Sequence, residues 1–510
     1  MNSGKICVSV CAESTDQVLN RIHRAETAGA DVIEIRFDCL EELAGFESLI
    51  DCLPEIPATY LFTFRPKEQG GHRETTLRDR LKFWERAHQV KRETYFLVDY
   101  EFDLLLRLQP DGERLIYSYH DFQGTPGDLE ERIETFSGLS GATLKVAVMA
   151  NDICDTVRLW QIFEKAKDQG RRMIPIAMGE AGKWTRVLGL AHGASITYAS
   201  LESGSQTAPG QISVDDLNNL YRVRELDRST DVYGIIAGDT SYSVSPYLHN
   251  AAFRTARLNC VFVPLQVADL GEFIRRMVEP ETREIDLNFK GFSVTNPHKQ
   301  AIIRHLDEVD ESAREIGAVN TVKIVDGRLH GYNTDAEGFI RPLTEAFGSL
   351  DGGRVAVVGA GGAARACIYS LMREGADITV FARNRSKAAD LISDYNAWFQ
   401  QLTIDENGSP RTDFAGFDIL VNTTPLGTRG QNENKTIAAA EHLSGVKLVY
   451  DLTYNPIETR LLSEAGRAGC AILGGLDMLI GQGARQFEIW TGLEAPLEAM
   501  RRSVTERLGL

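Results

Sequence analysis

The first 225 residues alternate short apolar runs with longer amphipathic stretches, and this alternation limits the available folds more than any other feature. The runs are KICVSV, DVIEIRF, TYLFTF, YFLVDYE, RLIYSYH, TLKVAVM, MIPIAM and ASITYA. A strand followed by a helix or connecting segment, repeated about eight times, is typical of a closed (β/α)8 barrel. We therefore expect an α/β protein whose residues 1–225 form such a barrel.

A second series of elements follows the predicted barrel. The polar stretch RVRELDRSTD at residues 222–231 is interpreted as the end of a last helix and a linker, and VYGIIAG begins the new series. A chain of 510 residues has room for about three domains. The second series is therefore long enough for two further domains.

The composition limits the partners of the chain. It carries a net charge of −17, which disfavours nucleic acid and anionic membranes as partners. No apolar run approaches the ~20 residues of a membrane span, and the N-terminal MNSGKICVSVCAES resembles neither a signal nor a transit peptide. We expect a cytoplasmic protein with small-molecule partners, and its oligomeric state is not readable from the sequence.

The 8 cysteines form neither a CxxC pair nor a finger-like Cys/His spacing. Cys7 and Cys11 lie in and just after a strand-like segment. A metal site there is conceivable, but we favour reduced structural thiols. The prediction is therefore that the protein has no metal site.

The run ATLKVAVMAN contains one charged residue, Lys145. One interpretation is that Lys145 lies at an edge and reaches water through its long stem. The other is that it is buried, loses its proton and acts as a nucleophilic amine. The segment by itself leaves both interpretations open.

The strand faces favour the second interpretation. In DVIEIRFD, the apolar residues alternate with Glu34, Arg36 and Asp38, and in a barrel the charged set would face the lumen. Arg65, Asp99, Glu101 and His120 fall at the carboxyl ends of other predicted strands, where barrel active sites lie. Structural ion pairs are the alternative. A lysine near a histidine and other cations indicates imine chemistry with a ketone.

Six motifs of this half resemble those of type I 3-dehydroquinate dehydratases: EIRFD, FRPKEQGG, SYHDF, LKVAVMA, AMGEAGKWTR and TAPGQI. The resemblance implies that Lys145 forms a Schiff base with the C3 ketone of 3-dehydroquinate. It also implies that His120 is the general acid–base group, supported by Glu34, and that Arg186 clamps the substrate carboxylate. The other implied pocket residues are Arg36, Arg65, Met178, Thr207 and Gln211.

Two positions depart from that family pattern. Gln69 replaces a frequent glutamate and Thr207 a frequent serine. Both retain hydrogen-bonding capacity, so we expect altered affinity rather than lost chemistry. The segment SLESGSQTAPGQI, rich in small residues, fits a lid over the substrate and an ordinary surface loop equally well.

RVAVVGAGGAARA is a predicted strand, glycine turn and helix start, and Gly359, Gly361 and Ala364 fit the dinucleotide-binding pattern. An NAD site would usually carry an acidic residue after the next strand. This chain has Arg383, Asn384, Arg385 and Ser386 there, which favours NADP(H). The alternative is that the arginines only solvate a helix start.

Four polar clusters precede the nucleotide motif: SYSVSP, GFSVTNPHK, GAVNT and GYNTD. Singly they are ordinary turn sequences, but together and in this order they resemble shikimate dehydrogenases across about residues 232–510. The resemblance implies that Lys299, paired with Asp335, protonates the substrate oxygen during hydride transfer. The departures, Tyr242 and Ser293, remove no proposed proton-transfer group.

The resemblance also implies ligand-binding residues in this half. Those for the substrate are Ser243, Ser245, Thr295, Asn320, Tyr454 and Gln482. Those for the cofactor are Gly359, Ala360, Gly361, Gly362, Ala363, Asn384, Arg385, Ser386, Thr424, Leu452, Gly475 and Met478.

Taken together, the motifs resemble a bifunctional 3-dehydroquinate dehydratase/shikimate dehydrogenase. This implies a dehydratase barrel at 1–225, a shikimate-binding domain at 232–336 plus 477–510, and a Rossmann NADP-binding domain at 337–476. One alternative is that the second half prefers quinate. Another is a ligand-sensing regulator built from decayed enzymes, against which the retained Lys145, His120, Lys299 and Asp335 argue.

Overall fold

The fold is taken from a computed structural model. It describes residues 2–90, 96–105, 107–108, 112–135, 141–202, 204, 206–395, 397–403 and 412–509. Contacts divide the chain into two compact units, residues 1–246 with 259–289, and residues 247–258 with 290–510. This division cuts through the predicted substrate-binding domain, and the three domain boundaries remain a prediction.

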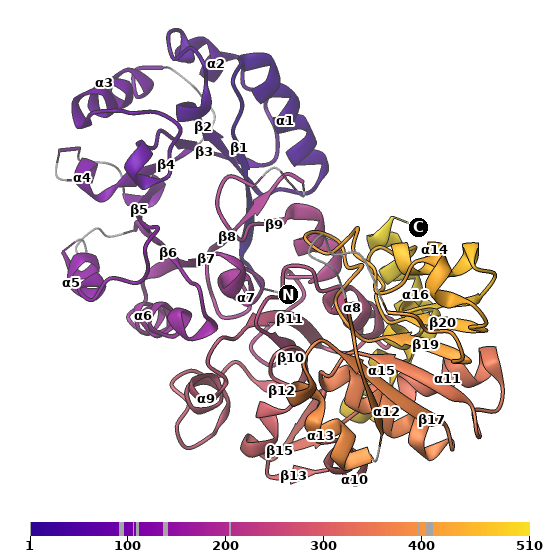
Figure 1. The fold of residues 1–510 in the computed structure, drawn as a ribbon. Helices are drawn as coiled ribbons and strands as arrows, with labels where there is room; N and C mark the ends of the chain where they lie inside the picture. The colour runs from indigo at the N-terminus through magenta and orange to yellow at the C-terminus, as the bar shows by residue number, and fades with distance from the viewer. Residues whose placement is uncertain are drawn as a thin grey trace. The chain divides into compact units, whose positions relative to one another are not determined.

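All eight predicted barrel strands are present, and they form one parallel sheet (Figure 1). Its hydrogen-bonded order is β7-β6-β5-β4-β3-β2-β1-β8-β9. The strands are β1 Lys5–Val10, β2 Val32–Arg36, β3 Thr59–Thr63, β4 Phe96–Glu101, β5 Leu115–Asp121, β6 Thr143–Met149, β7 Arg172–Met178, β8 Ile196–Ser200 and the short β9 Ile212–Ser213.

The predicted closure of the barrel is only partly seen in the hydrogen bonds. β1 pairs with both β2 and β8, so the first and the eighth strand of the predicted barrel are neighbours in the sheet. β7 and β8 approach each other, but the described residues form no hydrogen-bonded ladder between them. The barrel therefore has a seam between its seventh and eighth strands.

Helices and turns connect the strands on the outside of the sheet. α6, for example, buries Val157, Trp160 and Phe163 along one face, as an amphipathic helix does. The helices are α1 Thr15–Thr27, α2 Phe46–Cys52, α3 Leu77–Ala87, α4 Phe102–Leu105, α5 Leu129–Glu134, α6 Val157–Asp168 and α7 Lys183–Leu188. The short turns are η1 Phe37–Cys39, η2 Lys67–Gln69, η3 Gly112–Arg114, η4 Ile153–Thr156, η5 Glu180–Gly182 and the π-helical η6 Asp216–Leu220.

The barrel interior is layered. A hydrophobic cluster contains Val32, Leu61, Ile116, Ile174 and Ile196, which lie near the amino ends of their strands. Two residues further along the same strands, the side chains on that face are largely polar, because side chains on one face of a strand recur every second residue. The polar layer therefore lies toward the carboxyl ends, above an apolar floor.

Cys11 and Cys39 form a disulfide, so the expectation of a reduced thiol is wrong for Cys11. No local pattern indicates this pairing, because the partners are 28 residues apart and meet only when β1 and β2 lie side by side. Cys7 is free and buried, as expected.

Residues 231–289 continue the first unit, apart from the helical segment at 247–258. β10 (Asp231–Ala237) and β11 (Cys260–Gln266) pair in parallel. α8 (Ser245–Thr255) connects them, and α9 (Leu270–Phe273) and the π-helical η7 (Ile274–Val278) follow. The end of β6 is tied to this segment, since Gln266 Nε2 donates to Asn151 O and Ala268 N to Asp152 Oδ2.

In the second unit, β12 (Phe289–Val294), β14 (Thr321–Val325) and β15 (Arg328–Tyr332) form an antiparallel arrangement. Asp326 and Gly327 both have positive φ, as a tight hairpin turn requires. The remaining elements of this region are η8 Ala301–His305, β13 Glu308–Val309, α10 Glu311–Ile316 and α11 Asp335–Phe347.

A six-stranded parallel sheet with order β18-β17-β16-β19-β20-β21 follows, which is the strand order of a Rossmann fold. The strands are β16 Arg354–Val358, β17 Asp377–Ala382, β18 Trp398–Gln401, β19 Ile419–Asn422, β20 Leu448–Asp451 and β21 Ala471–Gly474. The helical elements are α12 Gly362–Arg373, α13 Arg385–Tyr395, η9 Ala440–Leu443, α14 Arg460–Arg467, α15 Leu476–Thr491 and α16 Leu497–Leu508.

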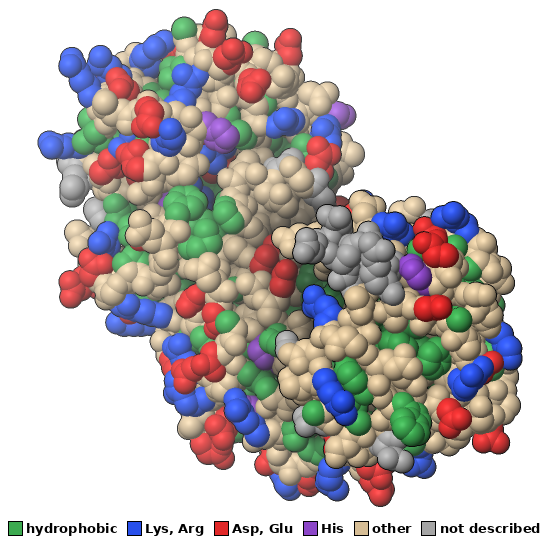
Figure 2. All heavy atoms as spheres, viewed as in Figure 1, with side chains coloured by type: hydrophobic (Ala, Val, Ile, Leu, Met, Phe, Trp, Pro, Cys, Tyr) green, Lys and Arg blue, Asp and Glu red, His purple; other side chains and the backbone are tan. Residues whose placement is uncertain are grey.

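The helix α15 returns to the antiparallel strands. Trp490 Nε1, on α15, donates to Val322 O on β14. None of the described helices is long and apolar enough to cross a membrane. Figure 2 shows acidic and basic side chains interspersed over the face in view, so the net charge of −17 is not gathered into one patch there.

Candidate active sites

Lys145 lies in the barrel lumen, and its side chain is only 4% exposed. Its Nζ donates to Asp99 Oδ2 at 3.2 Å and lies 3.9 Å from the centroid of the Tyr198 ring. Burial lowers the pKa of Lys145, Asp99 opposes that effect, and Arg65 adds to it. The edge interpretation is therefore excluded, and the amine loses its proton more easily than an exposed lysine does.

Arg65 links Lys145 to His120. Its Nη2 donates to Asp99 Oδ2 at 2.6 Å, and its Nη1 lies 2.5 Å from His120 Nε2. Burial lowers the pKa of His120 well below its ordinary value, and Arg65, Lys145 and Arg36 lower it further. His120 is therefore neutral near pH 7 and can accept a proton.

The shared carboxylate of Asp99 stays ionised. Burial acts to raise its pKa, but Arg65 and Lys145 outweigh burial and hold the pKa below the ordinary value. One negative charge thus lies between two cationic side chains in the lumen. Of these two cations, Lys145 is the stronger acid and therefore the one that can release its proton.

Glu34 contacts hydroxyl groups, and Arg36 contacts a carboxylate. Glu34 accepts hydrogen bonds from Ser9 Oγ and Thr63 Oγ1, whereas His120 faces Arg65. Arg36 forms a two-pronged bond with its neighbour Asp38, at 2.9 and 2.7 Å. The family resemblance implied that Glu34 supports His120, whereas the neighbouring strands place two hydroxyl groups beside that carboxylate.

Arg186 is buried without an acidic partner among the described residues. Its Nη1 and Nη2 approach only Tyr198 O and Pro209 O, at 3.4 and 3.5 Å, and its Nε has no partner. Burial lowers the pKa of Arg186 to about 10. A buried cation without a counter-ion is costly, so this guanidinium suits an anionic ligand.

The other predicted residues of the first site lie near the carboxyl ends of the strands or follow them. Met178 is buried at the end of β7. Gln211 Oε1 accepts from both N and Oγ1 of Thr207, and Gln69 Oε1 accepts from His120 N at 3.1 Å. In the predicted lid, Ser203 and Ser205 lie outside the described residues.

Two cavities of the described structure are not lined by Lys145. One of about 750 Å³ is lined by none of the predicted site residues. Another of about 430 Å³ is lined by Gln69, Arg80, Glu101 and Ser118 among others, so it reaches the polar layer of the lumen. Neither includes Lys145, and the assignment of the first site rests on its side-chain geometry.

In the second site, Lys299 Nζ lies 2.5 Å from Asp335 Oδ2. Asn320 Nδ2 donates to Asp335 Oδ1 and to Thr334 Oγ1, both at 2.9 Å, and approaches Gln482 Oε1 at 3.4 Å. Asn320, Asp335 and Gln482 come from separate segments of the chain, and the fold links them to Lys299 through Asp335.

Four further predicted substrate-binding residues are placed by their elements. Ser243 Oγ accepts from Ser245 N at the start of α8. Thr295 follows β12, and its carbonyl accepts from His298 N. Tyr454 follows β20 and is half-buried.

The predicted nucleotide turn joins β16 to α12. Gly359 has φ +127°, and a Cβ on it would lie 2.2 Å from Thr423 Oγ1. A Cβ on Gly361 would enter open space, whereas one on Gly362 would lie 3.1 Å from Lys299 Cδ. Ala360, Ala363 and these glycines leave the amino end of α12 accessible to an anion, with the Lys299 side chain beside it.

The end of β17 carries the residues predicted for the 2′-phosphate. Asn384 Oδ1 accepts from N and Oγ of Ser386 at the start of α13. The Arg385 guanidinium lies 5.4 Å from the Phe399 ring centroid, and Arg383 and Arg385 are exposed. The donor set suits a phosphate, because cations and small donors occupy the place of the usual acid.

The remaining predicted cofactor residues follow neighbouring strands. Thr424 N and Oγ1 both donate to Asn422 Oδ1 after β19. Leu452 follows β20, and a Cβ on Gly475 would lie 2.1 Å from Leu452 O. Met478 is buried on α15.

Several residues beyond the predicted catalytic and binding sets contact members of those sets. Asp99 and Tyr198 contact Lys145, and Thr334 contacts Asn320. Gln486 Nε2 donates to Asn320 O, and its Oε1 contacts His249 Nε2. For Asp99 and Tyr198 a signal existed, because both occupy lumen-facing positions of their strands.

Four family models match the chain. They describe a type I 3-dehydroquinase at residues 6–228, a shikimate dehydrogenase substrate binding domain at 235–322, a shikimate/quinate 5-dehydrogenase at 343–442, and a shikimate 5′-dehydrogenase C-terminal domain at 475–505. Each half of the chain is therefore matched along most of its length.

The chain is also similar to curated proteins and to a solved structure. The chloroplastic bifunctional 3-dehydroquinate dehydratase/shikimate dehydrogenase of Arabidopsis thaliana is 34% identical over 98% of this chain and 83% of its own. The NADP(+) shikimate dehydrogenase of Methanopyrus kandleri is 38% identical over 56% of this chain and 98% of its own. The Thermus thermophilus shikimate 5-dehydrogenase, solved with NADP(H) and shikimate, is 31% identical over 54% of this chain and 99% of its own, with a TM-score of 0.45.

Proposed function

Since this chain belongs to the family of bifunctional 3-dehydroquinate dehydratase/shikimate dehydrogenases, we propose that its two sites catalyse consecutive reactions. The first site dehydrates 3-dehydroquinate to 3-dehydroshikimate, and the second reduces that product to shikimate with NADPH. The protein is thus both a lyase and an oxidoreductase. Its cytoplasmic location and its lack of nucleic-acid and membrane partners stay predictions.

In the first site, Lys145 is the nucleophile. Its neutral amine attacks the C3 ketone, and loss of water leaves an iminium that acidifies the adjacent C–H bond. His120 then takes that proton and serves as the acid–base group as the hydroxyl group leaves as water. Hydrolysis of the iminium releases the product and restores the amine. The low pKa of His120 supports its start as a neutral base.

Arg186 orients the substrate. Its planar fork can bind both oxygens of a carboxylate, and the guanidinium has no acidic partner among the described residues. Binding of the substrate carboxylate would supply the missing counter-ion. The observation that carries the proposed dehydratase is this arrangement: a buried amine linked through Asp99 and Arg65 to a neutral imidazole.

In the second site, Lys299 gives a proton to the substrate oxygen, and Asp335, 2.5 Å away, orients it. Asn320 and Gln482, which lie beside Asp335, hold substrate hydroxyl groups. The glycine turn and Arg385 suit NADP(H), which supplies hydride to the ketone carbon when bound. The position of Lys299 beside Gly362 supports proton delivery close to the cofactor site.

One assay tests the whole proposal. Incubation of 3-dehydroquinate and NADPH with this protein alone should yield shikimate, while quinate should not replace shikimate as a substrate of the reverse reaction. Lys145→Ala should abolish dehydration and spare the reduction of added 3-dehydroshikimate. Lys299→Ala should slow reduction by about 10²- to 10⁴-fold and spare dehydration.

Borohydride separates the imine route from other eliminations. It should reduce the Schiff base and leave a covalent adduct on Lys145 when 3-dehydroquinate is present. An active dehydratase without that adduct would contradict the imine mechanism, and loss of both activities in Lys145→Ala would contradict the division between two sites.

A further inference from the structure

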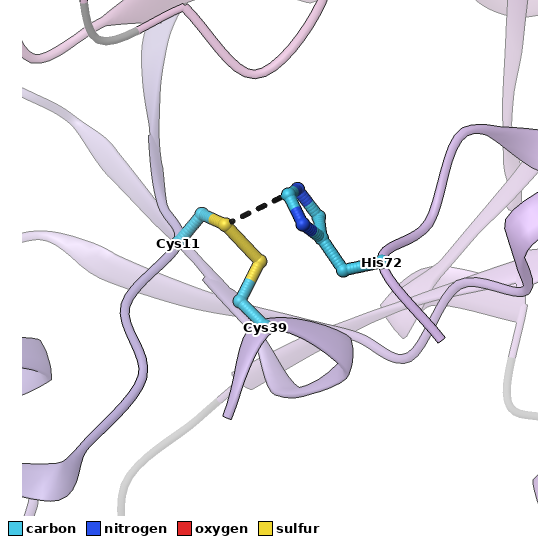
Figure 3. Close-up of side chains that lie close together, drawn as sticks. All are labelled: Cys11, Cys39 and His72. Atoms are coloured by element: carbon cyan, nitrogen blue, oxygen red, sulfur yellow. Dashed lines mark hydrogen bonds between the residues drawn. A yellow bond between two sulfur atoms is a disulfide. The ribbon is translucent and has the colours of Figure 1, made fainter. Parts of the chain in front are cut away.

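Three residues outside both proposed sites lie together near the carboxyl ends of β1 and β2 (Figure 3). Cys11 follows β1, Cys39 ends η1, and His72 lies in the segment after η2. His72 Nε2 is 3.6 Å from Cys11 Sγ, and the potential ligand atoms of all three residues lie within 4.8 Å of one another.

The chemistry of this trio depends on its oxidation state. In the disulfide, neither sulfur is a thiolate, and thiolate is the form that binds metals. A dithiol reductant transfers two electrons and two protons, becomes a disulfide itself and leaves two thiols on the chain. Two cysteines and one histidine are then the ligand types that Zn²⁺ prefers.

We propose that, in its dithiol form, the protein binds one Zn²⁺ through Cys11 Sγ, Cys39 Sγ and His72 Nε2. The metal displaces the two thiol protons, and solvent completes a tetrahedral site. The two charges of the thiolates balance the charge of the ion.

The surrounding backbone already holds the three ligands together. Asp38 Oδ2 accepts from His72 N at 3.0 Å, which ties the His72 segment to η1, where Cys39 lies. Pro66 and Arg73 form a bridge on either side of the segment that carries His72. Because the Cα atoms of the two cysteines are 5.4 Å apart, opening of the disulfide requires side-chain rotation rather than movement of the strands.

The site is open to solvent, and the backbone at both cysteines is held in place. His72 is exposed, so the ion can enter from solvent. Arg21 Nη1 donates to Cys11 O, and Arg73 Nη2 donates to Leu40 O beside Cys39.

The test is metal binding by the full chain, which needs no enzymatic activity. The reduced, metal-free protein is titrated with Zn²⁺ in competition with a chromogenic chelator, and with Co²⁺ while its absorption is recorded. We expect one equivalent per chain, thiolate-to-cobalt charge transfer and the intense visible bands of tetrahedral Co²⁺. The oxidised protein should bind at least 100-fold more weakly.

Variants assign the ligands. Cys11→Ser and Cys39→Ser should each lower the affinity at least 100-fold, and His72→Ala at least tenfold. Cys52→Ser is the matched control, because Cys52 is free and exposed, and it should bind as the wild type does. His72→Ala keeps the test valid if a cysteine variant fails to fold, since His72 is exposed.

Any of three results would overturn the proposal. The first is a reduced wild-type protein that binds neither metal, and the second is wild-type affinity in the Cys11→Ser/Cys39→Ser double variant. Unchanged affinity and an unchanged cobalt spectrum in His72→Ala would equally refute the three-ligand site.

Discussion

Lys145 depends on its immediate neighbours as much as on burial. Burial and Arg65 lower the pKa of its amine, while Asp99 raises it. Asp99 raises the pKa of Lys145 less than an unshared carboxylate would, because the same oxygen also accepts a 2.6 Å bond from Arg65. The lysine is therefore held in place by a carboxylate whose charge it shares with a stronger base.

Replacement of Arg186 should raise the stability of the barrel and weaken its action on the substrate. Replacement by Met removes a buried cation that lacks an acidic partner among the described residues, so the thermal midpoint of the barrel should rise. The kcat/KM for 3-dehydroquinate should fall by roughly 30- to 1,000-fold, as for a lost charge pair of 2–4 kcal/mol. Calorimetry and steady-state kinetics measure the two effects.

The matched control for Arg186→Met is Arg24→Met, since Arg24 is a half-exposed surface residue paired with Glu202. It should change neither quantity appreciably. A thermal midpoint that falls in Arg186→Met would contradict the view that this guanidinium lacks a counter-ion.

Glu101 should make the stability of the barrel fall as pH rises. Burial raises its pKa from 4.5 to about 7, despite Arg65 and Arg80. The folded state thus keeps a proton that the unfolded chain loses, so this contribution is full below pH 4.5 and disappears as pH rises through about 7. The loss is about 1.4 kcal/mol per pH unit.

Denaturant unfolding at several pH values measures this effect. Between pH 5 and pH 7.5, the free energy of unfolding of the wild type should fall relative to that of Glu101→Gln, by about 3 kcal/mol at most. Parallel pH profiles of the two proteins would show that Glu101 does not carry the proton.

At the scale of the elements, the amino end of α12 serves two purposes. Its free N–H groups can bind a phosphate, and its first residue, Gly362, makes room for the stem of Lys299. The glycine turn therefore shapes the proton-donor site as well as the nucleotide site. A side chain at Gly362 would press on Lys299, whose amine is held 2.5 Å from Asp335.

Gly362→Ala should lower the rate of 3-dehydroshikimate reduction about tenfold or more, because a Cβ would lie 3.1 Å from Lys299 Cδ and a small misplacement of a catalytic group is costly. Dehydration of 3-dehydroquinate should not change. Gly466→Ala on α14, where a Cβ meets open space, is the control and should leave both rates as they are.

At the scale of the whole molecule, the barrel does not end at its last helix. Residues 259–289 belong to the same compact unit, and they contact the loop that follows β6. Ala268 N donates to Asp152 Oδ2, and Arg276 Nη1 to Cys154 O. The strand that carries Lys145 is therefore braced by a segment from the other half of the chain.

A fragment of residues 1–228 should lose that support. We expect its dehydratase activity to disappear at a lower temperature than in the full chain, by several degrees for each kcal/mol lost. Activity remaining after heating and calorimetry both report this. Equal inactivation temperatures would mean that residues 259–289 add nothing to the stability of the barrel.

The sequence was sufficient wherever a local pattern determines the outcome. A periodicity of two residues predicts the eight strands and the lumen-facing side of DVIEIRFD. The backbone freedom of glycine predicts the turn before α12. Both act over only a few residues. Lys299, Asp335 and Asn320 were predicted from motifs, and the fold brings them together.

Contacts between distant segments could not be predicted from the sequence. Neither the disulfide of Cys11 with Cys39 nor the pairing of His120 with Arg65 in place of Glu34 has a local signal. The seam between β7 and β8 and the bracing of β6 by residues 259–289 likewise depend on how completed elements pack.

The sequence by itself therefore determined which elements form, which side chains face the lumen and which chemistry the chain carries out. Only the tertiary structure decided which charges become neighbours, and through them the pKa of Lys145, His120 and Glu101. The physical reason is that hydrophobic periodicity is a property of adjacent residues, whereas electrostatic interactions depend on distances in space that folding alone creates.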